Sequence, residues 1–149
     1  MSDNVLKLIP SSPTYVPGED KIKKALAHIK ESFPLTNKIR VNVSESPQFI
    51  DQGANFERII CPSCNAIIDT SWWQYAMDEA YNNGFRNLSV KVPCCGTETN
   101  LNELKYEWPA GFARFSIEIS NPETDISDST FHELEVALGS SLVRIWAHY

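Results

Sequence analysis

Two tight pairs of cysteines constrain this chain more than any other feature of its sequence. The first pair is Cys61-Pro62-Ser63-Cys64, and the second is Cys94-Cys95, followed by Gly96. A Cys-x-x-Cys turn places two sulfurs on one side of a tight loop, and a second pair brought back by the intervening chain completes a tetrahedral thiolate site. Pro and Gly favour such turns, because Pro fixes φ and Gly permits positive φ. The spacing therefore predicts one zinc ion with a structural role, held by Cys61, Cys64, Cys94 and Cys95.

With these cysteines, the segment 56–106 resembles a zinc ribbon or treble clef. The resemblance implies a metal-held element and carries no enzymatic activity with it. The second turn departs from the pattern, because Cys94 and Cys95 are adjacent where the family has Cys-x-x-Cys. Adjacent ligands strain simultaneous binding to one ion. Whether both ligate, or whether a histidine or water replaces one of them, stays open at this level.

On either side of this segment the chain follows a strand–helix–strand scheme. Ile22, Ala25, Leu26 and Ile29 form one apolar stripe of a helix over 19–33, which Pro34 ends. A second helix is expected over 130–138, with Thr130 and Glu133 as a capping box and Gly139 as its C-cap. A strand is expected over 5–9, a short apolar stretch that Pro10 stops, and others over 38–44, 112–120 and 142–149, where apolar and polar residues alternate. Within the cysteine-bearing segment we expect a helix to about residue 83 and a short one over 101–106.

This order predicts an α+β fold, a β-α-β-β-α-β antiparallel sandwich of the ferredoxin-like type with both helices on one face. Residues 1–55 and 109–149 would form the sandwich. Residues 56–108 would form a zinc-stapled, zinc-ribbon-like insertion between its second and third strands. A segment of that size cannot bury a large core alone, so a bound metal suits it.

Charge and composition restrict the classes of function. The formal net charge is -6, which disfavours general binding to phosphate backbones. The sequence has no apolar run long enough to cross a membrane, and its first residues lack the features of a signal peptide. We therefore expect a cytoplasmic protein without membrane contact, in a compartment where clustered cysteines bind metal more often than they form disulfides.

Catalytic signatures are missing from the sequence, which has neither a Gly-x-Ser-x-Gly motif nor a phosphate-binding glycine loop. We therefore predict a non-enzymatic protein. A dithiol redox protein remains an alternative, because Cys-x-x-Cys also occurs in oxidoreductases. Against it, the predicted helix starts several residues after Cys64, and the second cysteine pair has no role in redox chemistry of that kind.

The strand pattern also suggests a binding surface. Alternation places Arg40, Arg114, Arg144 and Trp146 on the sheet face away from the helices, where arginines and aromatics contact partner proteins. The same residue types bind RNA on open sheets, which is a further alternative. Trp72 is another candidate contact, since adjacent tryptophans are not expected to face one core from a helix. Packing of Trp72 between the insertion and the sandwich is the alternative. We thus predict a protein that binds or neutralises another, unidentified protein.

Overall fold

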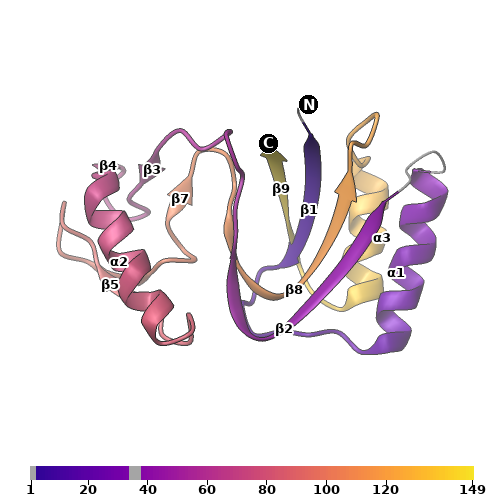
Figure 1. Cartoon of the computed structure of the whole chain (residues 1–149), viewed down its shortest axis with the longest axis horizontal. Helices are drawn as coiled ribbons and strands as arrows, with labels where there is room; N and C mark the ends of the chain where they lie inside the picture. Colours follow the sequence, from indigo (N-terminus) through magenta and orange to yellow (C-terminus); the bar gives the residue numbers. More distant parts are fainter. Residues whose placement is uncertain (1–2, 34–37) are drawn as a thin grey trace.

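The computed structural model, which describes residues 3–33 and 38–149, contains one four-stranded antiparallel sheet (Figure 1). The strands lie in the order β2-β8-β1-β9, with β1 (Asn4–Pro10), β2 (Ile39–Ile50), β8 (Gly111–Ser120) and β9 (Leu142–His148). The N-terminal strand is central and pairs with both β8 and β9. Its Leu6 and Leu8 side chains are fully buried. The fold is mixed α+β with antiparallel sheets, and the prediction of that class is confirmed.

Helices α1 (Glu19–Ser32) and α3 (Asp128–Leu138) cover one face of this sheet (Figure 1). The Ser127 hydroxyl caps α3 by accepting a hydrogen bond from the Thr130 N–H at 3.2 Å, so the predicted capping box at Thr130 is wrong. Gly139 ends α3 in the left-handed region, as expected. Pro34, expected to end α1, lies outside the described residues. Within the described ranges, no helix is long and apolar enough to span a membrane.

The main core lies between the sheet and these two helices. Phe115, Ile117 and Ile119 of β8 face the helices, as their alternation predicts. The cluster also contains residues of β1, α1 and α3, including Leu6, Leu8, Ala25, Ile29, Leu134 and Leu138. Burial of this contiguous apolar surface is the dominant favourable term that holds the helices on the sheet.

The face assigned to β9 from its sequence is wrong. Trp146 lies opposite Leu6 in the sheet and packs against the same helix-side core, so the Trp146 side chain points toward the helices. Arg144, opposite Leu8, shares that face. Ile145 belongs instead to a small cluster on the other face, together with Ile9. Alternation identifies which residues share a face, but both faces of β9 are covered, so it could not identify which one faces the helices.

The chain that follows β2 lies along the outer edge of β9. Gly53 forms a parallel bridge with His148 of β9, and the Ala54 N–H donates to the His148 carbonyl at 2.8 Å. Asn55 donates from its side chain to the Trp146 carbonyl at 2.9 Å. Residues 51–55 therefore run along the outer side of β9 before the chain continues into β3.

The residues between β2 and β8 form a second unit of structure with its own small sheets. Its elements are β3 (Ile59–Ile60), β4 (Ile67–Ile68), α2 (Thr70–Asn82), β5 (Ser89–Lys91), β6 (Glu98–Asn100) and β7 (Lys105–Tyr106). Strands β4, β3 and β7 form one sheet, and β5 and β6 form another. Figure 1 shows α2 on the opposite side of the four-stranded sheet from α1 and α3. The short helix expected over 101–106 is absent, because turns and β7 occupy those residues.

An aromatic cluster joins this unit to the sheet. Phe112 of β8 is fully buried, with its ring centroid 5.2 Å from Phe49 and 5.3 Å from Phe85. Trp72 and Trp73 both pack against this cluster, so Trp72 lies between the cysteine-bearing unit and the sheet, the alternative to an exposed contact. The expectation that adjacent tryptophans would not share one core is wrong. The four-stranded sheet and the cysteine-bearing unit are thus connected by packing as well as by the backbone.

Candidate metal centre

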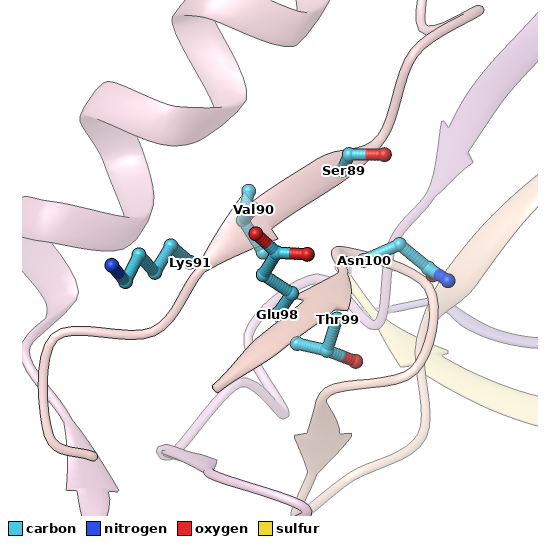
Figure 2. A pocket seen from close by; sticks show the side chains of 6 residues that line it. All are labelled: Ser89, Val90, Lys91, Glu98, Thr99 and Asn100. Atoms are coloured by element: carbon cyan, nitrogen blue, oxygen red, sulfur yellow. The ribbon is translucent and has the colours of Figure 1, made fainter. Parts of the chain in front are cut away.

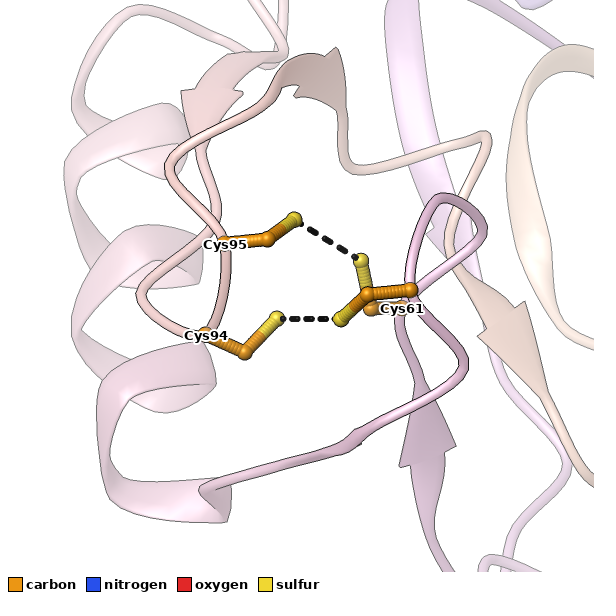
Figure 3. Close-up of side chains that lie close together, drawn as sticks. Cys61, Cys94 and Cys95 are labelled. Carbon is orange, nitrogen blue, oxygen red and sulfur yellow. Dashed lines mark hydrogen bonds between the residues drawn. The ribbon is translucent and has the colours of Figure 1, made fainter.

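Four cysteine thiols meet between the β3–β4 and β5–β6 hairpins. The sulfurs of Cys61, Cys64, Cys94 and Cys95 all lie within 4.8 Å of one another. Cys61 Sγ is 3.9 Å from Cys95 Sγ (Figure 3). Cys64 Sγ is 3.4 Å from Cys94 Sγ. A tetrahedral ion with metal–sulfur bonds of about 2.3 Å places its ligands about 3.8 Å apart. The four thiols are therefore close enough to hold a metal ion, and both adjacent cysteines take part in the cluster.

The first hairpin forms a tight turn that positions two of the sulfurs. The Cys61 N–H donates to the Ala66 carbonyl at 2.9 Å, and the Asn65 N–H donates back to the Cys61 carbonyl at 3.0 Å. Asn65 has a φ of 62°, a left-handed conformation that asparagine tolerates better than most residues. Pro62 begins the turn with its fixed φ. This geometry directs Cys61 inward, where it is buried, and leaves Cys64 exposed at the turn.

The second hairpin repeats the same turn. The Val92 N–H donates to the Thr97 carbonyl at 3.1 Å, and the Gly96 N–H donates to the Val92 carbonyl at 2.9 Å. Gly96 has a φ of 72°, matching Asn65. The matched hydrogen bonds align Cys61-Pro62-Ser63-Cys64-Asn65 with Val92-Pro93-Cys94-Cys95-Gly96. Sequence reasoning missed this correspondence, although the shared proline at the second position signals it.

The four thiols differ in their electrostatic environment. Hydrogen bonds from the backbone N–H groups of Cys64 and Ser63 lower the pKa of Cys61 to about 6, against the opposing effect of burial. The hydroxyl and N–H of Thr97 lower the pKa of Cys95. The hydrogen bond with Cys64, together with desolvation and the neighbouring thiols, raises the pKa of Cys94 to about 12. Neighbouring thiolates repel one another, and a bound cation would favour ionisation of all four.

A hollow of about 560 Å³ lies along the hairpin that carries Cys94 and Cys95 (Figure 2). Its walls are the side chains of both strands, namely Ser89, Val90, Lys91, Glu98, Thr99 and Asn100. They supply one cation and one carboxylate but neither histidine nor cysteine. The side chains of this region that are suited to binding a soft metal ion are therefore the four thiols.

The predicted partner-contact arginines do not gather around Trp146. Arg144 stacks on the Phe131 ring, with its guanidinium carbon 4.2 Å from the ring centroid, and forms an ion pair with Asp128 at 3.1 Å. Trp146 packs against the core beside it. The cluster of arginines with Trp146 that the RNA-binding alternative requires is thus not formed.

The remaining predicted contacts lie apart from one another. Arg40 is exposed on β2, opposite Glu118 of β8. Arg114 is partly buried and donates from Nε to the Ser44 carbonyl at 2.9 Å. Trp72 is half-buried against the aromatic cluster. Of these three residues, only Arg40 has an exposed side chain.

These observations define the class of molecule as a mixed α+β protein with a four-thiol cluster suited to a metal ion. No protein-family model, no curated protein and no solved structure matches the chain at a significant level.

Proposed function

We propose that this protein is a zinc-stabilised binding module without catalytic activity of its own. The observation that carries the proposal is the approach of all four sulfurs to within 4.8 Å of one another. Four soft thiolates in tetrahedral reach favour Zn²⁺ over the hard cations Mg²⁺ and Ca²⁺. Four protein ligands leave no position for a reacting water, which suits a structural ion.

The zinc would add bonds between two hairpins that share a core, since Ile59 and Ile68 of one and Val92 of the other lie in the same buried cluster. The β5–β6 sheet has two strands of three residues each, and isolated hairpins of this size are marginal in water. Cys61 and Cys64 come from one hairpin, while Cys94 and Cys95 come from the other. One ion bonded to all four would fix the hairpins to each other, and binding free energy would become folding free energy.

We assign the four-stranded part to the ferredoxin-like type. The antiparallel order β2-β8-β1-β9 supports this assignment, since the chain enters the sheet as strand, helix and strand twice. Both helices on one face support it as well. The cysteine-bearing unit would then be an insertion between the second and third strands of that scheme.

The partner would be another protein, contacted through the outer face of α2. Tyr75 and Tyr81 are 65% and 69% exposed on that helix, and tyrosine is enriched in protein interfaces. Asp78 and Glu79 lie between them on the same helix, which contains no basic residue. An exposed aromatic surface with carboxylates fits a partner that offers basic side chains.

Metal content per chain, combined with thiol titration before and after chelation, tests the zinc assignment. One zinc per chain, with four thiols protected until the chelator is added, is the expected result. Metal-free protein with a reactive or oxidised Cys61–Cys64 pair would contradict the proposal and favour the dithiol redox alternative.

The protein-binding assignment needs a matched comparison of surfaces. We expect crosslinking to a cellular protein to be lost in the Tyr75→Ala/Tyr81→Ala variant and retained in Val136→Ala. Val136 is a fair control, because it is 69% exposed and lies on α3, away from α2. Equal crosslinking of both variants would show that α2 is not the contact surface.

A further inference from the structure

The two matched hairpins make the four cysteines unequal. Cys64 and Cys95 occupy the same position of the turn, and Cys61 occupies the position that holds Val92 in the other hairpin. Both of these first positions are buried, with 0% exposure at Cys61 and 1% at Val92. Cys94 occupies the position of Ser63, which supplies no thiol in the first hairpin. The cluster thus combines three thiols at repeated or buried positions with one, Cys94, at a position that holds no thiol in the other hairpin.

Hydrogen bonds to the sulfurs follow the same division. Cys61 Sγ accepts from the Ser63 N–H at 3.4 Å, and Cys95 Sγ lies 3.2 Å from the Thr97 hydroxyl. In the described part of the chain, Cys94 Sγ has no backbone or hydroxyl donor and contacts Cys64 Sγ. Cys64 shares that lack of a donor, but it holds the turn position that both hairpins use for a thiol. Donors to sulfur orient a ligand and stabilise its negative charge, so Cys94 is the least supported of the four.

We propose that Cys94 is the exchangeable ligand of the metal centre and that a small thiol can replace it. The inference rests on the proposed function, since it requires the cluster to bind a metal ion. In the exchange, the bond from the metal to Cys94 breaks and the Cys94 sulfur takes up a proton. The incoming thiol loses its proton and forms the new metal–sulfur bond, so charge and ligand number are unchanged. Cys61, Cys64 and Cys95 remain bound to the metal. Three protein ligands is also the number found in zinc sites that keep an open coordination position.

Cobalt titration of the full-length chain tests this assignment, because tetrahedral Co²⁺–thiolate sites absorb in proportion to the number of bound sulfurs. We expect Cys94→Ala to bind one Co²⁺, with the sulfur-to-cobalt absorbance reduced by about one quarter, because three of four thiolates remain. Added 2-mercaptoethanol should restore that quarter. Cys61→Ala and Cys95→Ala should lose tight binding, with or without the added thiol.

A second variant separates ligand exchange from a folding defect. Val92→Cys in the Cys94→Ala background places a thiol at the position equivalent to Cys61. It should recover four-thiolate absorbance without added thiol. Loss of binding in Cys94→Ala as complete as in Cys61→Ala, unrelieved by Val92→Cys or by 2-mercaptoethanol, would overturn the assignment of Cys94. Failure of the unmodified chain to bind any metal would instead overturn the proposed function.

Discussion

Removing Asp51 should destabilise the protein more than removing Lys7, although the two residues form one ion pair. The Lys7 ammonium lies 3.1 Å from Asp51 Oδ1, and it also donates to the Asp51 carbonyl at 3.0 Å and to the Tyr149 hydroxyl at 2.7 Å. The Lys7 side chain is 6% exposed, whereas that of Asp51 is 42% exposed. Each substitution therefore leaves a different charge behind. Without Asp51 an ammonium is left in the protein interior, and without Lys7 a carboxylate is left in contact with water.

The expected magnitudes follow from that difference in exposure. Breaking a buried ion pair by removing one partner costs about 3–5 kcal/mol. We expect Asp51→Asn to cost about 3 kcal/mol, the lower end of that range, since Lys7 keeps two neutral acceptors. Lys7→Met should cost about 1 kcal/mol, because water solvates the remaining carboxylate and methionine fills the space. The double variant should be close to Lys7→Met alone, because neither charge remains.

Urea unfolding of the three variants, followed by tryptophan fluorescence, measures these differences. Burial alone would raise the pKa of Asp51, but the hydrogen bond and charge of Lys7 hold it below its usual value. The corresponding stability is present above the unfolded pKa of about 3.9 and is lost as pH falls through the lower folded value. Asp51→Asn should remove that part of the acid dependence. A Lys7→Met variant less stable than Asp51→Asn would refute the argument from exposure.

Three further predictions concern backbone, packing and protons. Gly53→Ala should cost at least about 2 kcal/mol in urea unfolding, because its φ is positive and the new Cβ would meet the His148 carbonyl. Gly18→Ala, with open space around it, should cost less than about 1 kcal/mol, the cost of alanine at the N-cap of α1. Phe112→Ala should cost about 3–5 kcal/mol by the same assay, and a cost below about 1 kcal/mol would place the ring outside the core. Metal binding at pH 8 should release a proton from Cys94 and none from Cys61, because their pKa values are about 12 and about 6. Indicator-dye titration checks this, since the Cys94→Ala variant should release one proton fewer than the unmodified chain.

The elements set by local pattern were predictable from the sequence. The apolar stripe of α1 and the left-handed Gly139 after α3 depend on neighbours a few residues away, and both are found where expected. The convergence of the four cysteines was also predictable, since a Cys-x-x-Cys turn needs only a second pair to complete a site. That inference used spacing alone and did not require knowledge of the distant chain.

Two expectations failed, one because of a local side-chain hydrogen bond and one because of a distant part of the chain. The apolar residues of 101–106 suggested a helix, but the Asn100 side chain accepts hydrogen bonds from the Asn102 and Glu103 N–H groups at 3.0 and 3.1 Å. Such a local turn competes with helix formation. The wrong face for Arg144 and Trp146 has another cause, since Ile50 at the end of β2 packs with Ile9 and Ile145 as a second buried layer on the other face of β9. Nothing near β9 in the sequence signals that layer.

The passage of residues 51–55 along β9 determines how this sheet can associate with other sheets. A sheet with two open edges can add strands at both ends and so propagate into a filament. Here the Gly53–His148 bridge and the Ala54 hydrogen bond occupy the outer side of β9. Within the described sheet, the remaining edge is that of β2. Edge-to-edge addition of a strand at β9 would therefore compete with these bonds at the C-terminal end of β9, which leaves β2 as the edge better suited to strand addition.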